Sequence, residues 1–166
     1  MPALTAPPRL VIKRADRRHL SDITALLAQL DDEPVLPLKR AEQLYRAMRR
    51  HPNYHVYLAW RDGEAIGTFS LLVIPTLMHD GAREALVDGV VTAPHCRGQG
   101  IGRRMMEAAM ALAARSGCYK LALSSNLKRL DAHRFYRDLG FRQHGISFSV
   151  TLTRAPLDPA WRGGAR

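Results

Sequence analysis

The sequence predicts one α/β domain in which helices cover a mixed sheet. Segments of strand composition come first in hairpins, a β-α-β stretch follows, and amphipathic segments at helical spacing lie between them. Hairpins join antiparallel strands, whereas a strand–helix–strand connection leaves its two strands parallel, so the sheet has to be mixed. The expected order is β-α-α-β-β-β-α-β-α-β, and the 166 residues fit a single domain with one core over about 9–153.

Strand and helix patterns alternate through the first half of the chain. Asp16 is a suitable cap for the first helix, and Asp62-Gly63 is a hairpin turn signal between a segment rich in aromatic and β-branched residues and its partner strand. Gly89, inside a later strand, indicates a bulge or a close approach of the backbone. The expected elements are a strand at 9–14, helices at 16–30 and 39–50, and strands at 54–61, 64–74 and 84–92.

The second half starts with a glycine-rich turn and continues as two helix–strand units. Gly117 and Gly140 are helix-stop residues, and residues 145–153 alternate between apolar and polar side chains as a strand does. The tail, 154–166, is rich in proline, glycine and arginine and is expected to be loosely ordered. The expected elements are a helix at about 101–115 with a buried stripe of Ile101, Met105, Ala108, Ala109 and Leu112, a strand at 119–124, a helix at 129–139 and a strand at 145–153.

The composition is that of a folded protein with a strongly basic surface. Apolar residues make up 46% of the chain and charged residues 24%, so disorder is not expected. The net charge of +10 should attract polyanions, either a nucleic acid or a cofactor that carries several phosphates. Dense basic runs are absent, with only pairs such as Arg49-Arg50 and Arg103-Arg104, and this argues against nucleic acid.

Membrane insertion and secretion are not expected either. The longest apolar run, Ala108 to Ala114, is far shorter than the roughly 20 residues of a membrane-spanning helix. Residues 1–9 hold three prolines and lack the apolar core of a signal peptide. Cys96 and Cys118 form neither a CxxC pair nor a disulfide framework, so we expect a cytoplasmic protein.

A glycine-rich turn between a strand and a helix carries the strongest functional signal; it reads Arg97-Gly98-Gln99-Gly100-Ile101-Gly102-Arg103. The N–H groups at a helix start face outward, and the helix dipole favours an anion there. Glycines let the backbone approach that anion, and the two arginines can add charge-assisted hydrogen bonds. Neither the dinucleotide pattern GxGxxG nor the Walker ending GK[ST] fits. The turn is therefore predicted to bind phosphates, the alternative being a tight turn without a ligand.

Three motifs in this order resemble those of the GNAT superfamily of N-acetyltransferases. Arg97-x-x-Gly100-x-Gly102 matches the superfamily's (Q/R)xxGx(G/A) motif, which binds the pyrophosphate of coenzyme A. Residues 87–94 resemble its fourth strand, and residues 124–141 resemble the strand end and helix that flank coenzyme A. The resemblance implies a mostly antiparallel mixed sheet of about seven strands with helices on both faces, and acetyl-CoA as co-substrate.

The resemblance also implies a set of cofactor-binding residues from the strand before the turn to the helix after it. Asn126 matches a position that bonds the pantetheine arm or orders the next loop, the alternative being a simple turn residue. Within the superfamily, residues 124–136 and 62–64 are similar to those of aminoalkylphosphonate N-acetyltransferases. The implied cofactor-binding residues are Val90, Val91, Thr92, Arg97, Gly98, Gln99, Gly100, Ile101, Gly102, Arg103, Asn126, His133 and Phe135.

The acceptor amine has to lose its proton before it can attack. Asp88 stands where superfamily members commonly carry a glutamate, so the resemblance makes it the candidate base, acting directly or through a water. Its side chain is one methylene shorter, which favours the water. The alternative is an ordinary exposed acid of the strand, and Glu84, on the same face, is a weaker candidate.

The resemblance assigns two further groups to the reaction. Tyr136 stands where the superfamily often has the general acid that protonates the leaving thiolate; the alternative is a core tyrosine on an amphipathic helix. The N–H of Val91, next to the expected bulge, is the candidate donor to the oxyanion. Both assignments complete a direct transfer in a ternary complex.

Other chemistry is not expected. The histidines and cysteines lack metal-ligand spacing, so no metal site is expected. Cys96 has no sign of a paired base for an acyl-enzyme, and His79 and His95 are loop residues for the surface or for substrate contact. The acidic patch at 31–33 either attracts a cationic amine or is a solvated helix end.

Three functions follow from these observations. The first is an acetyl-CoA-dependent N-acetyltransferase acting on a primary amine, more readily a small molecule than a protein, with no nucleic-acid or membrane partner; a homodimer is consistent with it. The second is a non-catalytic coenzyme A-binding module, for which Asp88 in place of glutamate leaves room. The third is a basic nucleic-acid-binding protein, which the missing aromatic platform makes the weakest of the three.

Overall fold

A computed structural model describes residues 9–30 and 34–152 of the chain, which divides into two compact units, 1–127 and 128–166. The acidic patch at 31–33 and the tail at 154–166 lie outside the described residues. The expectation of a single domain over 1–166 stays a prediction. None of the helices in the described ranges combines the length and the apolar character needed to cross a membrane.

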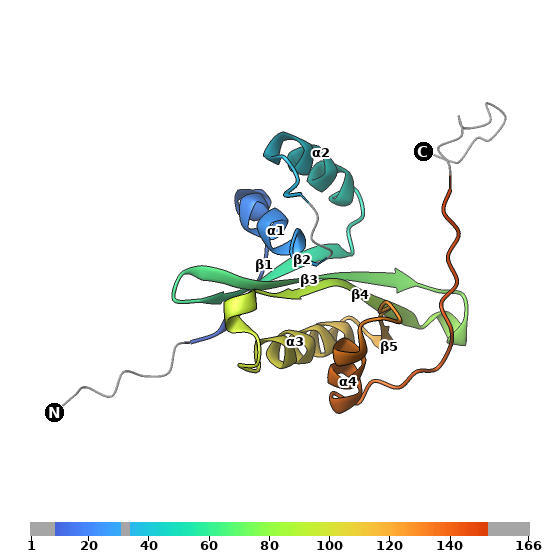
Figure 1. Ribbon diagram of the computed structural model, residues 1–166. Coiled ribbons are helices and arrows are strands. Elements are labelled where there is room, and N and C mark those ends of the chain that lie inside the picture. Colours follow the sequence, from blue (N-terminus) through green and yellow to red (C-terminus); the bar gives the residue numbers. More distant parts are fainter. Residues whose placement is uncertain (1–8, 31–33, 153–166) are drawn as a thin grey trace. The chain divides into compact units, whose positions relative to one another are not determined.

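The first unit contains a five-stranded sheet and three α-helices that follow the predicted order along the chain (Figure 1). Most boundaries lie within two residues of the prediction, except that the first helix divides into a 3₁₀ turn and a shorter α-helix. The elements are β1 (Val11–Arg14), η1 (Arg17–His19), α1 (Leu20–Leu27), α2 (Leu38–Met48), β2 (Tyr54–Arg61), β3 (Glu64–Pro75), η2 (His79–Gly81), β4 (Arg83–Thr92), η3 (Pro94–Cys96), α3 (Ile101–Arg115) and β5 (Cys118–Ala122).

The sheet is mixed and mostly antiparallel, as predicted. The strands lie in the order β1-β2-β3-β4-β5; the first three pairings are antiparallel, and β4 and β5 are parallel. The β2–β3 hairpin closes through Asp62 and Gly63, whose φ angles of 51° and 84° are those of the tight turn that this dipeptide predicts. Helix α3 makes the crossover that a parallel pair requires. The described sheet has five strands, and the expected seven is therefore corrected.

Helices cover both faces of this sheet. Figure 1 shows α1 and α2 on one face and α3 on the other. Helix α3 packs closely on β3, since a Cβ atom at Gly67 would lie 2.7 Å from Sδ of Met105. Ile101, Met105 and Ala109 are buried as predicted, but Met106 and Ala113 complete the stripe, whereas Ala108 and Leu112 are only half-buried.

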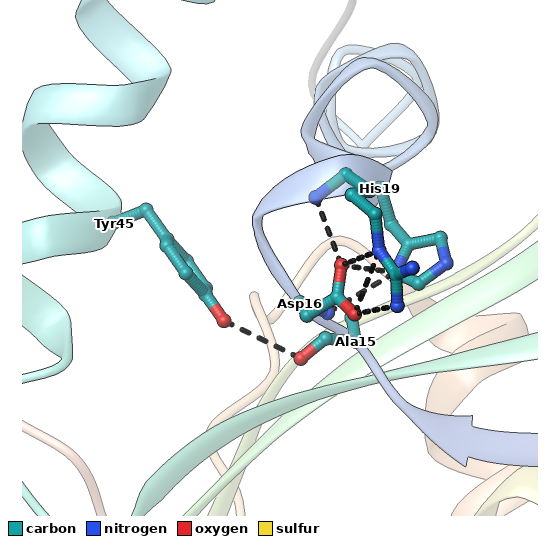
Figure 2. Close-up of polar contacts among 5 residues, drawn as sticks. Ala15, Asp16, His19 and Tyr45 are labelled. Atoms are coloured by element: carbon teal, nitrogen blue, oxygen red, sulfur yellow. Dashed lines mark hydrogen bonds and ion pairs between the residues drawn. The ribbon is translucent and has the colours of Figure 1, made fainter.

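Polar contacts tie η1 and α2 to the two residues that follow β1 (Figure 2). Asp16 caps η1: its Oδ1 accepts a hydrogen bond from the Arg18 N–H at 2.8 Å, while the Asp16 N–H donates to Nδ1 of His19 at 3.1 Å. The hydrogen bonds from the side chain and the backbone of Arg18 lower the Asp16 pKa to about 2. On α2, the Tyr45 hydroxyl donates to the carbonyl of Ala15 at 3.4 Å. The cap predicted at Asp16 is confirmed.

The second unit contains α4 (Leu130–Asp138), which the prediction places at 129–139. No strand follows it: residues 141–152 have no strand pairing, so the strand predicted at 145–153 is wrong for 145–152, and Thr153 lies outside the described residues. A strand exists only where a neighbour accepts and donates its backbone hydrogen bonds, and alternation alone does not supply one. The apolar side chains of the segment are 76–90% exposed; they are Ile146, Phe148, Val150 and Leu152.

Candidate active site

Strand β4 is interrupted by a bulge at Gly89, as predicted. The pairing register shifts between Thr68 and Ser70 of β3, so that Gly89 and Val90 together face a single residue of that strand. Gly89 has a φ of 58°, a value that side chains disfavour, and a Cβ atom there would lie 3.1 Å from the Leu27 side chain. The bulge therefore lies directly beneath the end of α1.

Asp88 precedes the bulge and is exposed. Its Oδ1 accepts a hydrogen bond from the Gly89 N–H at 2.7 Å, and its backbone carbonyl accepts one from the Ser70 hydroxyl at 3.1 Å. Among the described residues, none donates a hydrogen bond to Oδ2. One carboxylate oxygen is thus engaged at the bulge and the other has no donor among the described residues, an arrangement that suits a base.

Glu84, the weaker candidate for the base, has a different partner. Its Oε1 lies 3.2 Å from Nζ of Lys120 on β5, and its side chain is 19% exposed. Hydrogen bonds to Tyr119 and to Glu84 raise the Lys120 pKa, so this lysine stays charged. An acid held in an ion pair between two strands is poorly placed to take a proton from a substrate.

The last half of β4 has an open edge. β5 pairs with β4 only from Arg83 to Leu86, so over residues 87–92 no described strand lies on the β5 side. Backbone N–H and C=O groups on such an edge can pair with an extended ligand. Of the predicted residues here, Val90 and Thr92 are half-buried and Val91 is buried, so Val91 offers its backbone rather than its side chain.

The glycine-rich turn leads from this edge into α3. Gly98 and Gly100 have φ angles of 73° and 76°, and a Cβ atom at either would meet nothing within 4 Å, so both face open space. No side chain caps α3, and its first backbone bond runs from the Arg104 N–H to the Gly100 carbonyl at 3.1 Å. The N–H groups of residues 101–103 precede that bond and are available to an anion.

The side chains around the turn are basic. Arg97 and Arg103 are both exposed, and Nε of Arg97 donates to the Thr92 carbonyl at 3.2 Å, which fixes the guanidinium beside the end of β4. Of the other predicted residues of the turn, Gln99 is exposed and Gly102 is half-buried. Ile101 is buried and can contribute only its N–H. The fit to a diphosphate rests on the open space at the glycines, the uncapped helix start and these two arginines.

The other predicted residues follow β5 or lie on α4. Asn126 is exposed, four residues beyond the end of β5. In the second unit, His133 and Tyr136 are one helical turn apart on α4, and the Tyr136 ring lies 5.1 Å from that of Phe135 and 5.7 Å from that of Phe141. The catalytic role of Tyr136 and the cofactor role of its neighbours stay predictions.

The remaining loop residues have structural partners. Cys96 is fully buried and accepts a hydrogen bond from Arg61, and Nε2 of His95 lies 3.0 Å from Oε1 of Glu64. The His79 ring lies 4.7 Å from that of Tyr119. An open groove of about 540 Å³ between α1, the hairpin and residues 93–95 is lined by His95 but by none of the predicted catalytic or cofactor-binding residues. Within the described ranges, no group of three or more potential metal ligands occurs.

Sequence reasoning missed one residue of the site region, Arg61. It ends β2 and contacts two residues of the segment that includes the turn, Cys96 and Gln99. An arginine beside a hairpin turn is an ordinary surface residue in sequence, so no local signal could have identified it.

Comparison with known proteins gives a consistent result. A family model described as Acetyltransferase (GNAT) family matches residues 20–141. The chain is 37% identical to an aminoalkylphosphonate N-acetyltransferase of Salmonella typhimurium, over 61% of this chain and 65% of that protein. It is 31% identical to a glucosamine 6-phosphate N-acetyltransferase of Trypanosoma brucei brucei, over 86% and 96% of the two chains. The fold matches a transcriptional regulator from Bacillus halodurans C-125 with a TM-score of 0.80 and 26% identity, over 87% and 100% of the chains.

Proposed function

The chain belongs to the GNAT family of acetyltransferases, and we propose that it carries the acetyl group of acetyl-CoA to a small primary amine by direct attack. It is an acetyl-CoA-dependent N-acetyltransferase, and its fold is the family's mixed sheet with helices on both faces. The observation that carries the proposal is the continuity of the open β4 edge with the uncapped start of α3.

The donor would bind along this continuous surface. The diphosphate would meet the N–H groups of residues 101–103 and the guanidinium groups of Arg97 and Arg103. The thioester arm would pair with the backbone of residues 90–92, and the Val91 N–H would donate to the thioester oxygen as negative charge develops there. Asn126, His133 and Phe135 complete the proposed set through the family resemblance alone.

In the proposed reaction, the amine nitrogen bonds to the thioester carbon and the carbon–sulfur bond breaks. An alkylammonium with a pKa near 10.4 costs roughly 4–5 kcal/mol to deprotonate at pH 7. Asp88 would accept that proton, directly or through a water, from the oxygen that the bulge leaves facing solvent. Tyr136 would donate a proton to the departing sulfur.

The acceptor is proposed to be a small primary amine that carries a phosphoryl group. The two relatives compared above are named for an aminoalkylphosphonate and for glucosamine 6-phosphate, which share an amine and a phosphorus-centred anion. The net charge of +10 favours such an anion over a polyamine or an unsubstituted amino sugar.

Release of free thiol tests this proposal. The enzyme is mixed with acetyl-CoA and, in parallel, with an aminoalkylphosphonate, glucosamine 6-phosphate, glucosamine and a polyamine. We expect thiol release with the phosphoryl amines, and a kcat/KM for glucosamine 6-phosphate well above that for glucosamine, which differs only in the phosphate. Equal rates for that pair would contradict the phosphoryl requirement, and background rates throughout would contradict the enzymatic function.

One observation favours a second candidate, a non-catalytic coenzyme A-binding module. Asp88 is shorter than glutamate, and one of its oxygens is already engaged by the Gly89 N–H. Such a module would be stabilised by coenzyme A, by roughly 2.7 kcal/mol at 100 times its Kd, and would release no thiol with any amine.

We further propose that the protein is a homodimer in which each copy covers residues 145–152 of the other. Four apolar side chains of the segment are exposed, and residues 145–152 have no strand pairing in the described ranges. A monomer seldom leaves such a stripe in water. A second copy offers the same unpaired backbone, and two copies of one extended segment can pair antiparallel about a two-fold axis.

A further inference from the structure

The β2–β3 hairpin is fastened to the segment that leads into the glycine-rich turn. At the end of β2, the Arg61 guanidinium donates to Oε1 of Gln99 at 2.6 Å and to Sγ of Cys96 at 2.9 Å. At the start of β3, Glu64 lies 3.0 Å from Nε2 of His95. The two residues that flank the hairpin turn therefore hold three residues of the segment 95–99.

A bulge in β3 directs these contacts. Ala59 pairs with Gly67 and Trp60 pairs with Ala65, so Ile66 is the extra residue. Its carbonyl accepts a hydrogen bond from the Ala93 N–H at 2.9 Å, which extends the contact with β3 one residue beyond β4. The hairpin end is thus aligned with residues 93–99 through both backbone and side chains.

Gln99 links the hairpin to the turn itself. Its Oε1 accepts from Arg61, while its Nε2 donates to the His95 carbonyl at 2.9 Å. In the sequence, Gln99 stands between Gly98 and Gly100. The positive φ angles of these two glycines show a stretch of backbone that side chains do little to restrain. A contact at Gln99 is therefore placed to fix the direction in which the turn's N–H groups point.

We infer that Arg61 is a positioning residue for acetyl-CoA: it holds Gln99 and Cys96 so that the turn is preorganised for the diphosphate. This inference rests on the proposed role of the turn. Both terminal nitrogens of Arg61 are engaged by the protein, so it acts through the turn rather than as a ligand. Two separate nitrogens of the planar guanidinium reach the two acceptors, whereas a lysine keeps the charge but offers a single nitrogen.

Affinity for coenzyme A tests the inference without requiring turnover. Isothermal titration calorimetry compares the wild type with Arg61→Ala, Arg61→Lys and the control Arg46→Ala, which removes one exposed arginine from α2. Loss of the two bonds should raise the Kd about tenfold in both Arg61 variants, and Arg46→Ala should stay within about twofold. If Arg61→Lys binds like the wild type, Arg61 acts only as a charge and the inference fails.

Two further readouts separate positioning from general stability. Hydrogen exchange of the amides in residues 97–103 should accelerate in the free Arg61→Ala protein, while exchange in residues 105–113 of α3 stays unchanged. In turnover by Arg61→Ala, KM for acetyl-CoA should rise, while kcat should stay within about twofold of the wild-type value. Equal acceleration along all of α3, or a fall in kcat at unchanged KM, would overturn the inference.

A second variant keeps the test decisive if Arg61→Ala does not fold. Gln99→Met removes the acceptor of Arg61 and leaves the hairpin intact; because Gln99 is itself among the predicted cofactor-binding residues, its effect on the Kd is compared with that of the double variant. Combined with Arg61→Lys, Gln99→Met should raise the Kd by less than the product of the two single effects, because both changes break the bond between Arg61 and Gln99. Full additivity would contradict the linkage. If the wild type itself fails to bind coenzyme A, the proposed function fails rather than this inference.

Discussion

The Asp88 carboxylate accepts a hydrogen bond from the N–H of Gly89, the next residue along β4, at 2.7 Å. The bond lies at the bulge, where the pairing register of β3 and β4 shifts and Gly89 has a φ of 58°. The same feature that interrupts the sheet therefore fixes the orientation of the candidate base. Because this hydrogen bond restrains the Asp88 side chain, the carboxylate has little freedom to move towards the amine. This favours a water between Asp88 and the amine.

We expect Asp88→Asn to lower kcat by roughly 10²–10⁴-fold at pH 7, because the substitution removes the proton acceptor and keeps the shape. The deficit should narrow as the pH approaches the pKa of the amine, about 10, where the acceptor is already neutral. Steady-state kinetics between pH 6 and 10 measure both effects, with Asp22→Asn on α1 as the control. An Asp88→Asn enzyme as active as the wild type would assign the base elsewhere.

Gly100→Ala should weaken coenzyme A binding more than it weakens the fold. A Cβ atom at Gly100 meets nothing, so the cost to folding is that of a positive φ, on the order of 1 kcal/mol. The methyl group would nevertheless occupy the open space where the diphosphate is proposed to lie. Gly117→Ala is the matched control, since Gly117 has a φ of 73° and equally open surroundings at the other end of α3.

Thermal unfolding should report the same loss of stability for both glycine variants, and calorimetry should report weaker binding for Gly100→Ala alone. Equal affinities in the two variants would mean that the turn does not contact the ligand.

Local signals accounted for most of the fold. Asp62-Gly63 fixed the β2–β3 hairpin, and the glycines before and after α3 fixed both ends of that helix, because backbone conformation at these positions depends on the residue itself. The strand predicted at 145–153 failed for the opposite reason. Apolar and polar residues do alternate there, but a strand forms only beside another strand. Whether a second strand lies beside the segment depends on the tertiary structure and not on the local sequence.

The candidate site divides in the same way. The turn at 97–103 and the bulge at Gly89 were predictable because both need positive φ angles, which glycine adopts more readily than other residues. The contact of Arg61 with Gln99 joins residues that are 38 positions apart in the sequence, and the residues adjacent to either one contain no pattern that predicts it. The roles of His133, Phe135 and Tyr136 rest on family resemblance.

The cap at Asp16 should make stability depend on pH in a defined window. The Asp16 pKa is about 2 in the folded protein, below its ordinary value of 3.8, chiefly because the Arg18 side chain and N–H donate to the carboxylate. A depressed carboxyl pKa stabilises the fold fully above about pH 4, and this contribution is lost as the pH falls from 4 to 2. Asp16→Asn, which can still cap the helix, should therefore have a lower Tm than the wild type at pH 6.

The difference in Tm between these two proteins should shrink below pH 4 and vanish near pH 2, as measured by circular dichroism. Arg18→Ala should remove most of the same pH dependence, because it deletes the main donor. A difference that stays constant from pH 6 to pH 2 would show that the charge of Asp16 contributes nothing.

Phe148→Asp should convert the proposed homodimer into a monomer. Phe148 is 90% exposed in the single chain and is the largest of the four exposed apolar side chains of 145–152, so a charge there would be buried without a partner in the proposed dimer. Leu77→Asp is the matched control, since Leu77 is also fully exposed but lies in the first unit, in the loop between β3 and β4. Sedimentation equilibrium should give a dimer for the wild type and for Leu77→Asp, and a monomer for Phe148→Asp. A monomeric wild type, or a dimer that survives Phe148→Asp, would mean that the second copy does not cover this segment.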